Sequence, residues 1–527
     1  MDREYAKQRF AIAVFGTLLL WMVGIFNVLV NDDSKTVTSD NVVEIVPRPS
    51  PDKDETTDLY LLMMEEQVKD DVELTYLSEA PSISVLIKDS EFEGRKHDNV
   101  KLTSEGSFSV CFSYKGQNTE IFYAANDKVN LQDHDAWFAE GEVTINGYGN
   151  KIQLLSLKRD YGIPSFEGKI IVRKEGDDFY VVNELSLEDY LRYVVPSEMP
   201  SGYPKEALKA QAICARTYAY RFVQKPAYPE LGAHLDDSVS YQVFNNIPPQ
   251  KSTDEAIAET RGLLLTYEGI LAETFFYSTS CGFGTDVSVW NSNTERYPYL
   301  QAMNHGETKY MGVMALSNDE ALVIPSGEDM KKEEVFAKYI SGTCKEDFEA
   351  HLPWYRWQYQ VEKVDAEILE VKLREKYKTN PELVLTQNEQ GDFVSKEIGN
   401  IKHIKEIWVS ERRAGGAACG ICIQTQDELY QVLTENAIRT ILCDGVTKVV
   451  NNEGKKVSFK TMLPSAFFTI STSKTGENVI GYKVIGGGYG HGIGMSQNGA
   501  GQMAKSGYSA SQILQHFFEG TQVIGAY

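Results

Sequence analysis

The longest apolar run of the chain lies near its N-terminus. Residues 10–30 contain no charged side chain, and a helix of that length, rising about 1.5 Å per residue, spans roughly 30 Å of hydrocarbon. Basic residues precede the run and aspartates follow it, which by the positive-inside tendency keeps residues 1–9 in the cytoplasm. The pattern predicts a single-pass membrane anchor with the bulk of the chain outside the cytoplasm. A cleaved signal peptide is the alternative, but its apolar region is typically only about 7–15 residues long.

The polar pattern changes sharply after the anchor. Residues 31–80 hold fourteen acidic side chains, four basic ones and three clustered prolines. A segment of this composition buries too little apolar surface to order itself. We therefore expect an acidic linker at 31–80, interrupted by a short amphipathic helix at 59–77, where neither Gly nor Pro occurs.

Short runs of alternating apolar and polar residues follow the linker. They continue to about residue 182, as in Phe108–Phe112, and glycines and Asp/Asn pairs separate them. This period of two is typical of half-buried strands between turns. It predicts a β-rich N-terminal domain at 81–165, ahead of a larger region at 166–527.

The period becomes helical between residues 187 and 222. Apolar side chains recur there at 3.6-residue spacing, and Pro204 suits the first turn of a helix. Further on, residues 320–465 predict an α+β insertion, with helices near 331–341 and 365–377 and then strands near 404–410 and 420–425. The fold class predicted for the chain is α+β.

Length, composition and charge narrow the classes of function. At 527 residues, with 42% hydrophobic and 24% charged side chains, the chain is a globular protein of several domains. Its net charge of -23 repels polyphosphates, so nucleic acid is excluded as a partner. The seven cysteines are an odd, scattered set. The lone Cys419-x-x-Cys422 pair predicts a structural hairpin, reduced or oxidised, ahead of a metal or redox site.

The most constrained stretch of the chain runs from 187 to 220 and contains Glu198. Pro196 and Pro200 stiffen the backbone on both sides of this glutamate, just before the helix predicted to begin near Pro204. A carboxyl held in this way is a candidate general acid. A role as a simple helix cap is the alternative.

The predicted helix raises a difficulty for a proton donor. A helix N-terminus carries partial positive charge, which favours a carboxylate over the neutral acid. Burial of Glu198 against Met199 and Tyr203 would oppose that effect. On the helix itself, Gln211 and Arg216 flank the apolar stripe, and both carry donors suited to sugar hydroxyls or acetamido groups. Each is also commonly a solvated or ion-paired helix residue.

Two further stretches carry candidate binding groups. Residues 273–290 form an apolar strand that ends in a hydroxyl-rich and glycine-rich turn, and a hairpin turn is the plainer explanation. Residues 486–504 are rich in glycine, with His491 between two of them, but they lack the features of a phosphate-binding loop. A histidine bonded to the backbone of a crowded turn is the alternative for His491. The neutral groups of the first stretch are Tyr277, Ser278, Thr279 and Ser280.

Taken in order, the three stretches resemble the SpoIID/LytB family. The resemblance rests on Val-Val-Pro-Ser-Glu-Met-Pro at 194–200, on Glu-Ala-Leu-Lys-Ala-Gln-Ala with Ala-Arg-Thr-Tyr-Ala between 206 and 219, and on Gly-His-Gly-Ile-Gly-Met-Ser-Gln at 490–497. It covers roughly residues 165–527. It implies a catalytic region with a substrate groove.

The activity implied by the resemblance is that of a lytic transglycosylase. Such an enzyme cleaves the bond between N-acetylmuramic acid and N-acetylglucosamine in peptidoglycan, preferring strands that an amidase has stripped of stem peptides. The family's catalytic glutamate falls on Glu198. No cofactor is implied, and the implied partners are glycan strands, an amidase and other membrane-anchored wall-remodelling proteins. Binding roles fall on Gln211, Arg216, Tyr277, Ser278, Ser280, His491, Ser496 and Gln497.

The scarcity of nearby acids agrees with that activity. Hydrolysing glycosidases normally need two carboxyls, whereas a transglycosylase uses the C6 hydroxyl of its substrate as the nucleophile and needs only one. In the sequence, Glu206 is the nearest other acid to Glu198. In the second stretch, Asp286 is the only acid that follows the initial Glu273.

Four positions depart from the family pattern. Tyr203 stands where a tryptophan is common, and Asn498 replaces a common aromatic. Cys281-Gly-Phe-Gly replaces a commoner Gly-Gly run. Some relatives bind a metal with His and Cys near the second stretch, but here Tyr277 replaces the histidine and only Cys281 is present. We therefore expect no zinc.

Two other classes of function remain open. The chain could bind the cell wall without cutting it or modify an amidase, as LytB-type relatives are described to do. It could also be a structural protein of the engulfment or division machinery, with its β-rich domain binding partners.

Overall fold

The structure is a computed structural model that describes residues 71–527 except 93, 160, 239, 246, 307–312, 316–320 and 324. The predicted tail, the anchor at 10–30 and most of the acidic linker lie outside these residues. The described end of the linker is ordered and not helical: Val72 is buried and Glu73 forms a bridge with Ile270, so the predicted linker ends before residue 80 and the predicted helix at 59–77 does not extend through 71–77. No described helix reaches the length and hydropathy that crossing a bilayer requires. The described part contains eight α-helices and many strands, which confirms the prediction of a mixed α+β chain.

A seven-stranded sheet dominates the first part of the described chain, in the order β11-β1-β10-β9-β6-β3-β4. Alternate residues are buried in β6 and β9, as the period of two predicts, whereas β1 is buried over most of its length. A smaller sheet, β5-β2-β7-β8, accompanies it. The strands are β1 (Ser82–Ile87), β2 (Lys101–Ser104), β3 (Phe108–Tyr114), β4 (Gln117–Tyr123), β5 (Lys128–Asn130), β6 (Val143–Asn146), β7 (Ile152–Leu154), β8 (Ser165–Phe166), β9 (Lys169–Glu175), β10 (Asp178–Ser186) and β11 (Leu235–Asp236).

The predicted domain boundary at 165/166 falls inside this sheet. Strand β1 pairs antiparallel with β10 and parallel with β11, so residues from both sides of the boundary share one ladder. Alternation predicts that a segment is a strand, but the partner of that strand depends on contacts distant in sequence. The β-rich segment is therefore one structural body with the region that follows it.

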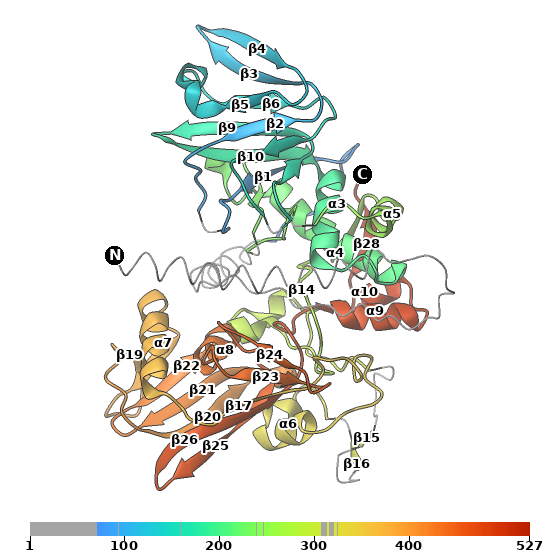
Figure 1. Cartoon of the computed structure of the whole chain (residues 1–527). Coiled ribbons are helices and arrows are strands. Elements are labelled where there is room, and N and C mark those ends of the chain that lie inside the picture. Colours follow the sequence, from blue (N-terminus) through green and yellow to red (C-terminus); the bar gives the residue numbers. More distant parts are fainter. Residues whose placement is uncertain are drawn as a thin grey trace, which may run out of the picture. The chain divides into compact units, whose positions relative to one another are not determined.

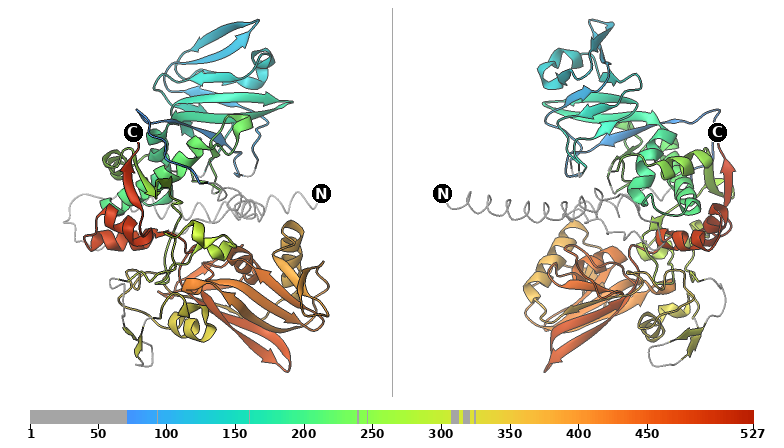
Figure 2. Two further views of the ribbon diagram at one scale, coloured as in Figure 1. Left: turned by 180° about the vertical axis from the view of Figure 1, so that it is seen from behind. Right: turned by 45° about the vertical axis from the view of Figure 1, so that its right-hand side comes forward.

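Helices α3 (Leu187–Glu198) and α4 (Lys205–Gln224) occupy the predicted helical segment, separated by a break at 199–204. The Ser186 hydroxyl caps α3 by accepting from the Asp189 N–H at 3.1 Å. Pro204 precedes the first turn of α4, as predicted. Helix α4 packs against α5 (Lys251–Glu259), α9 (Gln497–Lys505) and α10 (Ala510–Phe517) (Figures 1 and 2). The last two come from the far end of the sequence.

Shorter strands connect these helices to the rest of the chain. Strand β12 lies between β13 and β28, and β14 pairs with β27. Strands β15 and β16 form a separate pair. Their bounds are β12 (Leu263–Tyr267), β13 (Ile270–Leu271), β14 (Phe276–Tyr277), β15 (Val313–Ala315), β16 (Ala321–Val323), β27 (Met495–Ser496) and β28 (Gln522–Gly525).

Two five-stranded sheets, β24-β23-β17-β26-β25 and β19-β18-β22-β21-β20, form the predicted α+β insertion. The two predicted helices and two predicted strands are confirmed as α6, α7, β20 and β21, but the sheets extend past residue 465. The elements are α6 (Glu333–Ile340), β17 (Trp357–Val361), α7 (Ala366–Thr379), β18 (Val384–Gln387), β19 (Phe393–Ser395), β20 (Ile404–Arg412), β21 (Ala418–Thr425), β22 (Leu429–Leu433), α8 (Glu435–Leu442), β23 (Lys448–Asn451), β24 (Lys456–Ser458), β25 (Phe468–Thr475) and β26 (Asn478–Gly486).

All seven cysteines have free thiols. Cys419 and Cys422 lie on one strand, β21, at a spacing of three residues. Side chains at that spacing point to opposite faces of a strand, so the oxidised form of the pair is excluded by geometry. The predicted hairpin turn at this pair is replaced by a single strand.

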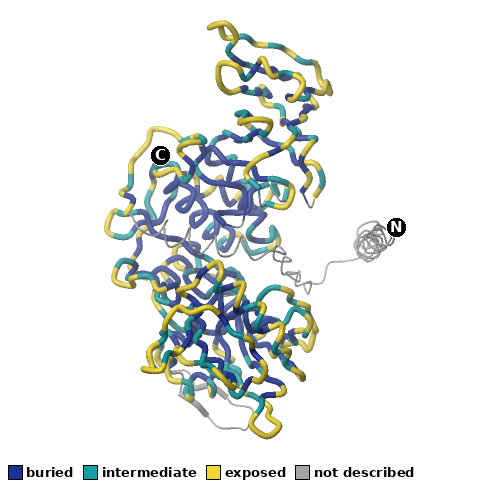
Figure 3. The backbone as a smooth tube through the Cα atoms, turned by 90° about the vertical axis from the view of Figure 1, so that its left-hand side faces the viewer, coloured by how far each residue is buried: buried dark blue, intermediate teal, exposed yellow. Residues whose placement is uncertain are grey.

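The buried hydrophobic residues form three clusters. In Figure 3 the buried residues follow the inner parts of the backbone and many exposed residues lie on its outer loops. Val195 belongs to the first cluster and Met199 to the second. Glu198 therefore lies where two hydrophobic clusters adjoin.

Candidate active site

Glu198 is the last residue of α3 and is half-buried. We expected it on a loop near the positive end of the next helix. It lies instead at a helix C-terminus, where the backbone dipoles carry partial negative charge and disfavour a further negative charge. The Val243 N–H donates to its Oε1 at 2.8 Å. The carboxyl is thus aimed by one helix end and one backbone donor.

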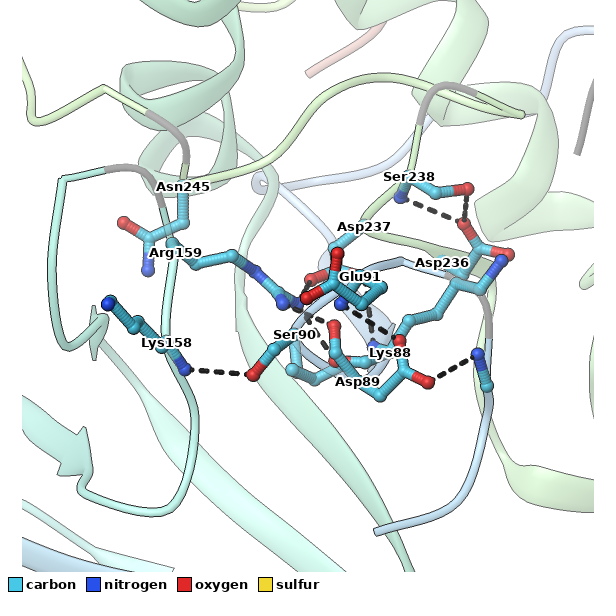
Figure 4. A network of polar contacts seen from close by, with 12 residues as sticks. Lys88, Asp89, Ser90, Glu91, Lys158, Arg159, Asp236, Asp237, Ser238 and Asn245 are labelled. Atoms are coloured by element: carbon cyan, nitrogen blue, oxygen red, sulfur yellow. Dashed lines mark hydrogen bonds and ion pairs between the residues drawn. The ribbon is translucent and has the colours of Figure 1, made fainter. Parts of the chain in front are cut away.

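The loop that supplies Val243 is anchored by a buried ion pair (Figure 4). Arg159 Nη2 and Asp237 Oδ2 are 2.6 Å apart, and both side chains are almost fully buried. Asp237 also accepts from the Lys88 N–H at 3.0 Å. Burial raises the pKa of Asp237, while the Arg159 guanidinium lowers it. The β-rich segment therefore holds in place the loop that contacts Glu198.

Strands β14 and β27 bring the second and third sequence stretches together. They pair in parallel, with Tyr277 opposite Ser496, and the Asn498 N–H donates to the Ser278 carbonyl at 2.9 Å. The Asn498 side chain also links Tyr203 to Thr279, at 2.7 and 2.9 Å. Asn498, which replaces an aromatic of the family pattern, thus joins all three stretches.

Gln497 connects this pair of stretches to Glu198. Its Nε2 donates to the backbone carbonyl of Glu198 at 3.0 Å and lies 3.4 Å from the Gln211 Oε1. The Gln211 side chain is fully buried, and its Nε2 has no hydrogen-bond partner among the described residues. Three of the predicted residues, Glu198, Gln211 and Gln497, therefore meet at one place.

Glu349 is a buried acid of this neighbourhood that the sequence analysis missed. Its Oε1 accepts from the Ser280 N–H at 2.9 Å and from the Ser496 hydroxyl at 2.8 Å. Burial raises its pKa to about 8. No local pattern marks Glu349, because it lies in a polar connection outside the three stretches.

Arg216 does not point toward a binding groove. Its guanidinium is fully buried and pairs with Glu188 at 2.8 and 3.0 Å, with the Ile257 carbonyl at 3.2 Å alongside. The predicted binding role is replaced by a structural one, because a cation at this depth must be neutralised within the protein. The helical spacing correctly placed Arg216 beside the apolar stripe of α4. It could not indicate that α5 packs against this side of the helix.

His491 also has a structural role. The Ile493 N–H donates to Nδ1 at 3.0 Å, so Nε2 carries the proton and donates to the Phe276 carbonyl at 3.1 Å. Burial lowers the pKa of the ring to about 4, so it is neutral at pH 7. Both nitrogens are engaged with backbone, as in the alternative considered for this residue.

The remaining predicted residues lie around Glu349. Ser496 and Ser280 are fully buried, and Ser278 is partly exposed. Tyr277 is buried, and its hydroxyl has no hydrogen-bond partner among the described residues. These positions suit the support of a site better than direct contact with a large substrate.

Two other expectations for the site concern a metal, which we did not expect, and a substrate groove, which we did. The described residues contain no group of three or more His, Cys, Asp and Glu side chains arranged to hold a metal ion. A cavity of about 350 Å³ lies between α7 and the neighbouring sheet, lined by residues such as Val361, Leu369 and Tyr482. None of the predicted site residues lines it, so the predicted substrate groove is a separate feature and stays a prediction.

Sequence comparison places two matched regions on this geometry. The family described as stage II sporulation protein (SpoIID) matches residues 175–267. The chain contains a SpoIID domain. Glu198, Gln211 and Val243 lie inside it, whereas Glu349 lies inside residues 286–494, which match a domain of unknown function (DUF8618).

Several curated proteins are similar to this SpoIID-domain chain. An uncharacterised protein of Brachyspira hyodysenteriae is 26% identical over 79% of the chain and 87% of its own length. The amidase enhancer of Bacillus subtilis is 29% identical over 63% of the chain, and the match spans 40% of that longer protein. Stage II sporulation protein D of Bacillus subtilis is 24% identical over 65% of the chain and 75% of its own length. The chain is homologous to proteins named for sporulation and for the enhancement of an amidase.

Proposed function

We propose that this SpoIID-domain protein is a lytic transglycosylase acting on peptidoglycan, with Glu198 as its general acid and base. The observation that carries the proposal is the convergence on Glu198 of Val243 at its carboxylate and Gln497 at its backbone carbonyl. Two elements distant in sequence thus fix a half-buried carboxyl at a helix end. An enzyme must hold a proton donor within hydrogen-bond reach of its leaving group in this way.

The reaction needs one carboxyl and no cofactor. Protonated Glu198 donates its proton to the glycosidic oxygen as the bond to C1 of N-acetylmuramic acid breaks, and N-acetylglucosamine leaves with a free hydroxyl. The C6 hydroxyl of the same muramic acid then bonds to C1, and its proton passes to Glu198. The product ends in 1,6-anhydro-N-acetylmuramic acid, and the acid is regenerated.

The other acids considered from the sequence support a single-acid scheme. Glu206 accepts from the Ala510 N–H at 2.7 Å at the start of α10 and from Lys209 at 3.0 Å. Asp286 accepts from the Ser288 N–H at 2.9 Å. Both carboxylates are engaged in holding local structure and do not supply the second group that a hydrolase requires.

The setting we propose is the outer face of the cell membrane. Residues 10–30 would anchor the chain there, with the catalytic region facing the wall and an amidase supplying glycan strands without stem peptides. Other membrane-anchored wall-remodelling proteins are the partners expected in this setting. Sporulation, division and general wall turnover are all compatible with it.

A second function is favoured by one comparison. A similar protein is named an amidase enhancer, so a wall-binding protein that modifies an amidase without cutting glycan is the alternative. In that case Glu198 would contribute to structure or to glycan binding.

Mass spectrometry of the products from amidase-treated peptidoglycan separates the two functions. We expect the wild-type protein to release anhydro-muramyl products. The Glu198→Gln variant should release them at least about 100-fold more slowly. Glu255→Gln, which changes an exposed glutamate of the same domain, serves as the matched control. Equal release by wild type and Glu198→Gln, or an amidase stimulated equally by both with no anhydro product, would favour the alternative.

A further inference from the structure

Glu349 contacts both stretches that surround the proposed active site. The side chain is 1% exposed, and a single oxygen, Oε1, accepts from Ser280 of the second stretch and Ser496 of the third. A buried carboxyl that bridges two loops restricts their relative position more than either loop contact alone.

The segment that carries Glu349 is itself fixed. Two residues earlier, Asp347 accepts from the Tyr355 hydroxyl at 2.5 Å, the Tyr339 hydroxyl at 3.0 Å and the Asn304 amide at 3.2 Å. Any side chain at position 282 would collide with Asp347, because an added Cβ at Gly282 would lie 2.0 Å from its Oδ2. Glu349 is thus presented from a rigid support.

The bridge acts on the first turn of α9. Ser496 is the N-cap of that helix, where its hydroxyl oxygen accepts from the Gly499 N–H at 3.1 Å while its hydrogen is donated to Glu349. The next residue, Gln497, donates to the carbonyl of Glu198. Two hydrogen bonds, joined by the peptide bond between Ser496 and Gln497, therefore connect Glu349 to the backbone of Glu198.

We propose that Glu349 is a positioning residue for glycan cleavage, which holds Ser496 and through it the contact of Gln497 with Glu198. The inference rests on the proposed function and gives the region of unknown function a role, because that region supplies a residue that completes the site of the SpoIID domain. Glu349 acts through other residues and does not touch substrate.

Glu349 performs this role as a neutral acid. Burial raises its pKa to about 8, and the charge of Asp347 acts in the same direction. Tyr203, Tyr277 and Cys281 are the other titratable groups whose charges interact with it. Since Oε1 accepts both hydrogen bonds, the proton belongs on Oε2, which has no hydrogen-bond partner among the described residues. Glutamine reproduces the shape and acceptor of this neutral form.

The test measures turnover of amidase-treated glycan by the full chain across pH 6–9. We expect Glu349→Ala to lower kcat about 10–100-fold with little change in KM, since misplaced catalytic groups cost rates of this order. Glu349→Gln should retain kcat within about threefold and lose any decline of kcat near pH 8. Glu346→Gln, an exposed acid of the same segment, is the control. Full activity of Glu349→Ala, or equal loss in Glu349→Gln, would overturn the proposal.

A second variant tests the same chain of contacts. Ser496→Ala removes the hydroxyl between Glu349 and α9, so it should cause a similar loss and add nothing to Glu349→Ala in the double variant. It also replaces Glu349→Ala in the test should that variant fail to fold. Full additivity of the two losses would show that they act independently and would contradict the inference.

A structural readout keeps this inference separate from the proposed function. If wild type and Glu198→Gln release no anhydro product, the proposed function fails, and hydrogen exchange of residues 495–503 then decides on positioning alone. We expect faster exchange of the first turn of α9 in Glu349→Ala and Ser496→Ala but not in Glu349→Gln or Glu346→Gln. Unchanged exchange in Glu349→Ala would refute the positioning role.

Discussion

The backbone carbonyl of Glu198 accepts a hydrogen bond of 3.0 Å from Nε2 of Gln497, a residue 299 positions later. The same amide lies 3.4 Å from the side-chain oxygen of Gln211. This contact joins the end of α3 to the first residue of α9. The orientation of the proposed catalytic carboxyl therefore depends on a helix from the opposite end of the sequence.

Loss of this contact should affect turnover more than folding. Replacing Gln497 by Ala removes its hydrogen bonds to Glu198 and Gln211, each worth about 1 kcal/mol, and we expect a roughly tenfold lower kcat for release of anhydro products. Gln502→Ala, on the same helix, is the matched control and should keep wild-type turnover. Unchanged kcat in Gln497→Ala would show that the contact does not orient Glu198.

Arg216 provides a test of structural against binding roles. Arg216→Ala leaves Glu188 buried without its cation, so the free energy of unfolding should fall by about 3–5 kcal/mol. Arg192→Ala removes a partly exposed arginine and should cost about 1 kcal/mol or less. Urea denaturation measures both. An Arg216→Ala protein of normal stability with weakened glycan binding would restore the binding role that the sequence predicted.

The Arg159–Asp237 ion pair of Figure 4 should be important for the contact between the β-rich segment and the loop at the active site. Arg159→Ala leaves Asp237 buried and uncompensated, and we expect a loss of about 3–5 kcal/mol in the free energy of unfolding together with reduced turnover. Arg173→Ala breaks a partly exposed pair with Glu142 in the same segment and should have little effect. Equal stability of the two variants in urea would contradict this expectation.

The raised pKa of Glu349 predicts a pH dependence of stability. Its folded pKa of about 8 lies above the ordinary value of 4.5, so the folded protein holds a proton that the unfolded chain has released. Relative to Glu349→Gln, the wild type should therefore lose stability as pH rises from about 5 to 8, by up to about 1.4 kcal/mol per pH unit. Above that range the difference should level off. A difference that stays constant in urea titrations from pH 5 to 9 would mean that Glu349 is ionised throughout.

Local signals predicted several elements correctly but not their partners. The period of two gave the strands of the first sheet, and the helical period with Pro204 gave α4, because side-chain direction and the first turn of a helix are set by neighbouring residues. The same signals placed a domain boundary at 165/166 inside a continuous ladder between β1 and β10. Strand pairing brings together residues that are about 100 positions apart, and no local pattern encodes it.

For the candidate site, too, the sequence predicted some features and the tertiary structure decided others. By itself the sequence determined the α+β class and the positions of α6, α7, β20 and β21 in the insertion, because these depend on short-range periodicity. The prediction of Glu198, Gln211 and Gln497 as site residues came from contiguous motifs that resemble a family. Only the tertiary structure decided that Glu198 ends a helix and that Arg216 and His491 bond to internal partners. It also decided that Glu349 accepts a hydrogen bond from Ser496. Burial and hydrogen-bond partners are set by segments that meet only when the chain folds, and these determine whether a polar side chain can bind, donate a proton or support its neighbours.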